Sequence, residues 1–267
     1  MGTTSKALSL LELFSRATPE IGLTDFARRA GMNKATTYRL LTDLAAHGFV
    51  EQVGSGREYR LGPAFLRLSA LREAAVPMRE VAVDVLNRLS QATGETAHMS
   101  LLQGELLSTI AYAYSDAHGT QVRMEDAEVL TLHATSSGLA VLAFCPMDFV
   151  DQVLSQPLAA RTKETITDPH QIRQQLDQFR QQGFAVSVGG FEQDVHSHAV
   201  PVFDSNSTCI GAVAVAASAA RMNDILQSLI QRELLDSTTR LTRLLGGFPP
   251  AQFRPQHDQT RPTERCL

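Results

Sequence analysis

The chain has 267 residues, of which 43% are hydrophobic and 19% charged, with no tryptophan and a formal net charge of −4. This length suits two domains, and no apolar run approaches the roughly 18–20 residues needed to span a bilayer. The three cysteines are far apart and form no CxxC pair, which argues against a zinc finger and favours a reduced, cytoplasmic compartment. The N-terminal segment has no basic region ahead of an apolar core, so we expect a helix there rather than a signal peptide.

The charge is unevenly divided along the chain. Residues 1–75 contain ten Lys and Arg against seven Asp and Glu, which gives +3, so the remainder carries −7. A basic first quarter on an acidic body is typical of a DNA-binding module joined to another domain. The charge difference alone is weak evidence for DNA binding, because a few surface charges usually do no more than contact solvent.

Three short helices are predicted in the basic first quarter. Residues 5–16 have apolar side chains at helical spacing. The stretch LTDFARRAG predicts a second helix of about two turns, with Thr24 as its N-cap and Gly31 as its stop. Asn33 is the expected N-cap of a third helix, so the second and third helices form a candidate helix-turn-helix.

A hairpin is predicted directly after the third helix. Beyond Gly48 the apolar period changes to two in FVEQVGSGREYRLG, with a tight turn at residues 54–56. A hairpin in this place is typical of the wing of a winged helix. The inner face of the third helix is expected to carry Thr37, Leu40, Leu41 and Leu44, and its outer face Lys34, Thr36, Arg39 and Asp43.

The second part of the chain predicts an α+β domain. Gly62 and Pro63 mark a boundary, after which residues 63–75 and 77–93 each have helical period. Strands are predicted within residues 96–113, 184–188, 197–204 and 209–217, and helices at 136–145, 170–182 and 221–245. This order favours an antiparallel sheet over regular βαβ repetition. The Pro-, Gln- and Arg-rich end of the chain predicts disorder.

Several motifs in series carry a family resemblance. They include KALSLLELF, LTDFARRAGMNKATTYRLLTDLAAHGFVEQ and REYRLGPAFLRL in the first quarter, then ATGETAHMSLLQGE, LHATSSGLAVLA and QGFAVSV. On these motifs, the chain resembles the IclR family of bacterial transcription regulators over about residues 5–246.

The resemblance implies a winged helix-turn-helix (1–62), a linker helix (63–76) and a GAF-like effector-binding domain (77–246), ahead of a disordered tail (247–267). It also implies binding to double-stranded operator DNA near a catabolic operon, as a homodimer or a dimer of dimers. A small metabolite would act as effector, and we expect no cofactor and no membrane association. Whether the protein is a repressor or an activator stays open, because the same parts serve both.

The third helix is the expected reading element. Thr36 and Thr37 are small enough to let the helix enter the major groove, and Lys34 and Arg39 can reach guanine or phosphate. Phosphate contacts are expected from Arg28, Arg29, Arg57 and Arg60. The alternatives are a plain amphipathic core helix and arginines that are merely solvated.

The motif LHATSSG predicts an effector site at the start of a helix. If Thr135 or Ser136 caps that helix, free backbone amides near Ser137 and Gly138 favour an anionic group, although a cap and nothing more is the alternative. The resemblance places Ser187, Ser197, Ala214 and Ala216 on the facing side, where relatives that bind small oxo-acids have an acid, a Cys or Ser, and two Ser. This chain has Ser187 in place of the acid, and Ala214 and Ala216 in place of the two serines. These differences favour a larger, partly apolar effector, such as an aromatic acid or a phenol.

The stretch DVHSHAV permits two further readings. His198 is a candidate for hydrogen bonding to the effector, and Asp194, His196 and His198 together suggest metal ligands. No second ligand cluster lies nearby in sequence, so we predict no metal site. An enzyme is disfavoured because P-loop, GxSxG and HExxH motifs are absent. A sensing module that acts only through protein partners is the other alternative.

Overall fold

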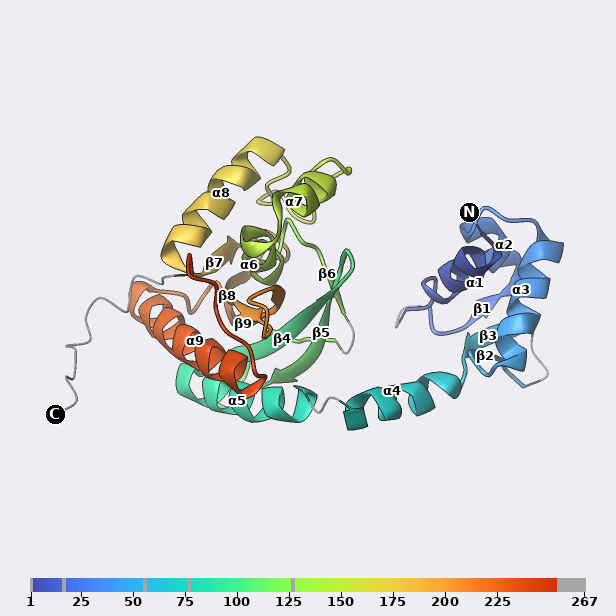
Figure 1. Ribbon diagram of the computed structural model, residues 1–267, viewed down its shortest axis with the longest axis horizontal. Helices are drawn as coiled ribbons and strands as arrows, with labels where there is room; N and C mark the ends of the chain where they lie inside the picture. Colours follow the sequence, from blue (N-terminus) through green and yellow to red (C-terminus); the bar gives the residue numbers. More distant parts are fainter. Residues whose placement is uncertain (1, 16–17, 55–56, 76–77, 126–127, 254–267) are drawn as a thin grey trace. The chain divides into compact units, whose positions relative to one another are not determined.

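The chain folds into two compact units, residues 1–77 and 78–267 (Figure 1). The structure is a computed structural model and describes residues 2–15, 18–54, 57–75, 78–125 and 128–253. The predicted α+β class, with a helix-turn-helix first and an antiparallel sheet second, is confirmed. Within the described ranges, no helix has both the length and the apolar character needed to cross a membrane.

The first unit is a small helical domain with a three-stranded sheet. Its helices are α1 (Thr3–Leu11), α2 (Leu23–Arg29), α3 (Lys34–Ala46) and α4 (Ala64–Ala75), and its strands are β1 (Ile21–Gly22), β2 (Val50–Gln52) and β3 (Glu58–Leu61). The sheet has the order β1-β3-β2 and is antiparallel throughout. One apolar cluster, which includes Leu10, Phe26, Leu40, Leu41 and Tyr59, joins α1, α2 and α3 to the sheet.

Local signals in the first unit were largely correct. The Asn33 side chain accepts a hydrogen bond from the Thr36 amide, as predicted for the N-cap of α3. Gly31 ends the α2 turn with a φ of +63°, a conformation that side-chain-bearing residues rarely adopt. The wing is present as β2 and β3, although residues 55–56 of its predicted turn lie outside the described part of the chain.

Two expectations in this unit were wrong. Thr24 is not the N-cap of α2, because β1 pairs with β3 up to Gly22, and the helix starts at Leu23 without a side-chain cap. Helix α1 ends at Leu11 rather than at residue 16, since the amides of Leu13 and Phe14 bond to carbonyls three residues back and tighten the chain into a turn. At the start of α2, pairing between β1 and β3 therefore overrides the local cap signal of Thr24.

The second unit is a six-stranded antiparallel sheet with helices on both faces (Figure 1). The sheet has the order β6-β5-β4-β9-β8-β7. Its strands are β4 (Thr96–Gln103), β5 (Leu106–Ala113), β6 (Val129–Leu130), β7 (Ala185–Val188), β8 (Val195–Phe203) and β9 (Cys209–Ser218). Its helices are α5 (Met78–Thr93), α6 (Ser136–Phe144), α7 (Met147–Leu154), α8 (Pro169–Gln182) and α9 (Asp224–Leu244).

Each face of the sheet has its own apolar core. Helices α5 and α9 pack on one face around Met99, Val200, Val213 and Val215. Helix α6 packs on the other face, with α7 and α8 outside it. Because side chains alternate along each strand, adjacent residues belong to different cores.

The end of the chain is more ordered than its composition suggests. The Phe253 ring contacts the rings of Phe144 and Phe203, with centroids 5.4 and 5.3 Å apart. The Gly247 amide donates to the Thr242 carbonyl at 2.8 Å. The prediction of disorder was therefore wrong for residues 247–253, while residues 254–267 lie outside the described ranges.

The capping assignments predict different stabilities for two substitutions. Asn33→Ala removes the acceptor for the Thr36 amide and should reduce the free energy of unfolding of the first unit by about 1 kcal/mol. Thr24→Ala, at the position that only resembles a cap, should cost less than roughly 0.5 kcal/mol. Urea denaturation, with amide hydrogen exchange of α3 as the local readout, compares the two. Equal losses for both variants would contradict the assignment.

Candidate functional site

The exposed face of α3 carries two basic side chains near its N-terminal half. Lys34 and Arg39 are exposed, Thr36 is half-buried between them, and within the described ranges neither cation has an ion-pair partner. Both cations therefore remain available to a negatively charged partner. Sequence reasoning missed Tyr38 on this helix, which is 55% exposed and adds a hydroxyl to the same surface.

Thr37 does not share that surface. It is fully buried, and its hydroxyl donates to the Asn33 carbonyl at 3.0 Å. Its spacing to Leu40, Leu41 and Leu44 places it on the inner stripe of the helix. The expectation that Thr37 contacts DNA was therefore wrong, because its side chain packs in the domain core.

Of the four arginines predicted to contact phosphate, two form ion pairs within the part of the protein that the structure describes and two do not. Arg28 pairs with Asp25 and Arg60 pairs with Glu51, each with a nitrogen–oxygen distance of 2.7 Å. Both pairs are well exposed, so they contribute little to stability, but they lower the net positive charge offered to phosphate. Arg29 and Arg57 are exposed and, among the residues described, have no ion pair.

The second unit contains a pocket beside the N-terminus of α6. Its empty space amounts to about 420 Å³, a figure that includes the part open to solvent. Thr135, Ser187, Ser197 and Ala216 line it, four of the residues predicted for an effector site. Strand register brings three of them together, because Ser197 pairs with Ser187 on one side and with Ala216 on the other.

The other predicted effector residues lie outside the pocket lining. Ala214 is fully buried in the core under α6, and Ser136 and Ser137 are almost fully buried. Gly138 has a packing role: a Cβ there would lie 2.3 Å from the Leu132 carbonyl oxygen, so only glycine permits the close approach. These residues shape the N-terminus of α6 rather than face the pocket.

Most hydroxyls near the pocket are already engaged. Thr135 caps α6 as predicted, accepting from the Gly138 amide at 3.0 Å and donating to the Thr131 carbonyl. The Ser187 hydroxyl donates to the Ala134 carbonyl at 2.8 Å. Ser197 differs, because no residue in the described ranges hydrogen-bonds its hydroxyl. Ser197 is therefore the lining hydroxyl most available to a ligand.

His198 points away from the pocket, contrary to the prediction that it contacts the effector. It pairs with Val215 and lies on the sheet face covered by α5 and α9, whereas its neighbour Ser197 lies on the pocket face. Burial, together with a smaller effect of the nearby His196, lowers the pKa of His198 to about 4. No group of three or more His, Cys, Asp or Glu suited to a metal lies within the part of the chain that the structure describes.

Two carboxylates that sequence reasoning missed also line the pocket, Glu128 and Glu192. Burial raises the pKa of Glu128, and a hydrogen bond from the Glu125 backbone lowers it. The negative charges of Glu192 and Glu125 also raise this pKa, and the charge of Arg161 lowers it. The Arg161 guanidinium lies over the ring of Phe191, 4.8 Å from its centroid. No local motif marks these glutamates, because they come together only through the fold.

The remaining lining is apolar and comes partly from the loop after β5. Val122 and Met124 of this loop join Leu130, Phe191 and Val195. The Thr96 hydroxyl donates to the Val122 carbonyl at 2.9 Å, and the Tyr114 hydroxyl bonds to both backbone groups of Met124. The wall of the pocket is thus tied to β4 and to the end of β5.

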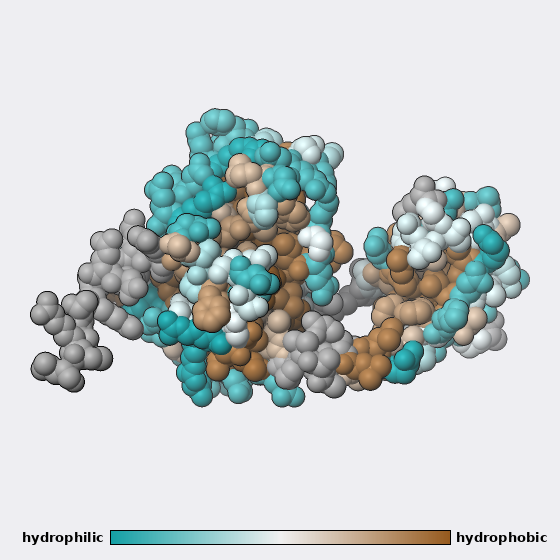
Figure 2. Space-filling view, viewed as in Figure 1, coloured by the Kyte–Doolittle hydropathy of each residue, from teal (hydrophilic) through white to brown (hydrophobic). Residues whose placement is uncertain are grey.

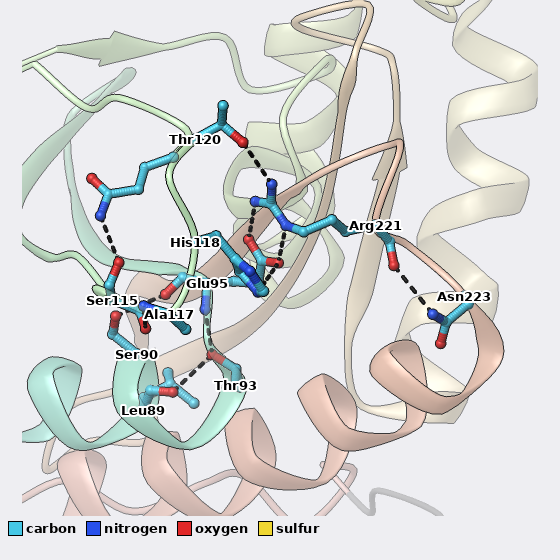
Figure 3. A network of polar contacts seen from close by, with 11 residues as sticks. Leu89, Ser90, Thr93, Glu95, Ser115, Ala117, His118, Thr120, Arg221 and Asn223 are labelled. Carbon is cyan, nitrogen blue, oxygen red and sulfur yellow. Dashed lines mark hydrogen bonds and ion pairs between the residues drawn. The ribbon is translucent and has the colours of Figure 1, made fainter.

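A buried ion pair fixes the base of the same loop (Figure 3). Arg221 donates to both carboxylate oxygens of Glu95, at 2.7 and 2.6 Å, and to the Thr120 hydroxyl at 3.0 Å. The Glu95 side chain is 1% exposed, and His118 approaches it at 3.8 Å. Hydrogen bonding to Glu95 raises the pKa of Arg221. A bidentate pair of this kind orients both side chains as well as binding them.

Comparison with known proteins assigns the chain to a family. The family model "Bacterial transcriptional regulator IclR C-terminal" matches residues 73–242, and the "IclR helix-turn-helix domain" matches residues 3–54. The chain belongs to the IclR family. As IclR relatives are transcriptional regulators with a DNA-binding helix-turn-helix, the coarse function of this chain is transcription regulation.

Individual IclR relatives match over nearly the whole chain. An IclR-type regulator from Silicibacter sp. TM1040 has a crystal structure that is 52% identical, with a TM-score of 0.91, covering 95% of this chain and 100% of that one. The regulator XynR of Escherichia coli K12 is 27% identical over 252 residues, covering 90% of this chain and 96% of XynR. An IclR homologue from Microbacterium hydrocarbonoxydans, solved with 4-hydroxybenzoate, is 24% identical with a TM-score of 0.73, covering 91% and 100%.

In this IclR-family chain, removing only the arginine of the Glu95–Arg221 pair should destabilise the second unit more than neutralising both partners. Arg221→Met leaves the buried Glu95 carboxylate without its bidentate partner and should lower the free energy of unfolding of the second unit by about 3 kcal/mol. Adding Glu95→Gln to Arg221→Met removes the stranded charge and should restore part of that loss. Urea denaturation of the four proteins in the cycle measures both steps. A double variant that is less stable than Arg221→Met would contradict this explanation.

The buried histidines predict acid sensitivity of the second unit. Burial lowers the pKa of His98 and of His198 from 6.5 to about 4, so the unfolded chain binds protons first as the pH falls. Their stabilising contribution should be complete above pH 6.5 and lost progressively toward pH 4, by on the order of 3 kcal/mol for each histidine. Urea denaturation between pH 7.5 and pH 4 checks the slope. His98→Gln should flatten it, and an unchanged slope in that variant would count against the assignment.

Proposed function

We propose that this protein regulates a catabolic operon by binding operator DNA through α3 and the wing, in response to a small organic effector. The observation that carries the DNA-binding part is the exposed face of α3, where Lys34, Thr36 and Arg39 stand without internal ion pairs in the described chain. Side chains near the N-terminal end of such a helix meet base edges in the major groove. Arg29 and Arg57 would contact phosphates, with Arg28 and Arg60 as weaker contributors.

The proposed effector is a partly apolar organic acid that binds in the pocket beside α6. The apolar wall of Val122, Met124, Leu130 and Phe191 favours a ring or a similar apolar body. The Ser197 hydroxyl and the N-terminal end of α6 favour a carboxylate. The IclR homologue solved with 4-hydroxybenzoate supports an aromatic acid as the first class to test.

We also propose that the protein acts as a homodimer or a dimer of dimers in the cytoplasm, where operator DNA lies. Helix α4 exposes Phe65, Leu66, Leu68 and Leu71, with Leu66 at 77% (Figure 2). Such a patch on a helix favours association with a second copy. Two copies would present two α3 helices to the two half-sites of an operator.

The DNA-binding proposal predicts a selective loss of affinity. Arg39→Ala and Thr36→Ala should each weaken binding to the DNA upstream of the protein's own gene by at least roughly tenfold, because each removes a contact to bases or phosphate. The thermal stability of the second unit should not change. Gel shifts at several salt concentrations measure affinity, and Lys34→Ala should lower the salt slope by about one.

Arg88→Ala is the matched control, since Arg88 is an exposed arginine of α5 in the second unit. It should bind DNA like the wild-type protein. Unchanged gel shifts for Arg39→Ala and Thr36→Ala together would overturn the proposed reading helix. Absence of any DNA binding by the wild-type protein would favour a sensing module that acts through protein partners.

A further inference from the structure

Among the described residues, the ionisable side chains that line the pocket are all acidic. Glu128 comes from the segment before β6 and Glu192 from the loop between β7 and β8, and no Lys, Arg or His lies among the described residues of the lining. Glu128 is half-buried and Glu192 exposed, whereas Ala216 and Ser187 on the sheet are buried. We name Glu128 and Glu192 the acidic rim.

Among the described residues, neither glutamate of the acidic rim has an ion-pair partner, although a hydrogen bond from the Glu125 backbone lowers the pKa of Glu128. Glu192 and Glu125 both raise the pKa of Glu128, which means that negative charges crowd this part of the pocket. Arg161 opposes them, but its guanidinium lies over Phe191, and it forms no ion pair with either rim glutamate in the described structure. A ligand whose charge is solely negative would add to this repulsion, whereas a cation would relieve it.

We infer that the effector carries a positively charged nitrogen, which Glu128 and Glu192 bind at the rim of the pocket. The inference rests on the proposed function and narrows its effector class. The apolar body would lie against Met124, Leu130 and Phe191, and an acid group would reach Ser197 beside the start of α6. The ligand chemistry is therefore that of an amino acid with an apolar side chain, rather than that of a simple carboxylic acid.

Three probes with one phenyl ring separate these charges: L-phenylalanine, 2-phenylethylamine and 3-phenylpropanoate. Titration calorimetry with the full-length wild-type protein at pH 7 measures the affinity of each. We expect both amine-bearing probes to bind at least about tenfold more tightly than 3-phenylpropanoate. Tighter binding of 3-phenylpropanoate, or no binding of any probe at millimolar concentration, would overturn the inference.

Variants of Glu128 and Glu192 then test whether these two glutamates cause the expected order of probe affinities. Combining Glu128→Gln with Glu192→Gln should weaken binding of 2-phenylethylamine by about tenfold or more and tighten binding of 3-phenylpropanoate, since the rim charge is removed at nearly constant volume. Glu125→Gln is the matched control, because Glu125 influences Glu128 but does not line the pocket, and it should change the affinities much less. A ranking that survives in the rim double variant would also overturn the inference.

Failure of the inference and failure of the proposed function give different results. Gel shifts of the wild-type protein without ligand test DNA binding alone. If L-phenylalanine binds no more tightly than 2-phenylethylamine, the proposal that the effector has an acid group is wrong, while the proposal of a charged nitrogen is unaffected. If DNA binding fails but the probe ranking holds, the regulatory proposal is wrong and the pocket chemistry stands.

Discussion

The alternation of side chains across the six-stranded sheet decides which residues of the second unit can meet a ligand. Both faces are covered by helices, so each strand has one side toward α6 and one side toward α5 and α9. Ser187, Ser197 and Ala216 stand in register on the pocket face, while His198 stands one residue further along on the opposite face. A shift of one residue in β8 would exchange a serine hydroxyl for a buried imidazole, so the pocket depends on register before it depends on any single side chain.

The same kind of constraint separates neighbouring residues on α3. Successive residues of a helix differ by about 100° in direction, so Thr36 and Thr37 cannot occupy the same face. The domain core uses Thr37, whose hydroxyl also bonds to the Asn33 carbonyl, and leaves Thr36 beside Lys34 and Arg39. Burial of the inner stripe thus fixes the rotation of the helix and determines which of its side chains are exposed to a binding partner.

Features with local causes were predictable from sequence, and features with distant causes were not. The Asn33 cap and the wing follow from neighbouring residues, and strand spacing correctly predicted the antiparallel sheet. Thr24 looked like a cap, but strand pairing of Gly22 decides where α2 begins. The acidic rim left no trace in the sequence, because Glu128 and Glu192 are 64 positions apart and only the fold brings both to one pocket.

The negative remainder of the chain limits how a protein of net charge −4 can approach DNA. Residues 76–267 carry −7 and repel phosphate, so electrostatic attraction is confined to the first 75 residues. Within that module, Arg28 and Arg60 are partly neutralised by Asp25 and Glu51, which concentrates the uncompensated charge on residues such as Lys34 and Arg39. If α3 binds the groove as proposed, charge of this distribution would raise the fraction of encounters in which α3 faces the groove more than it would raise overall affinity. In that proposal the acidic second unit and the basic α3 have the same effect, because repulsion of the acidic surface and attraction of the basic one both orient the protein on DNA.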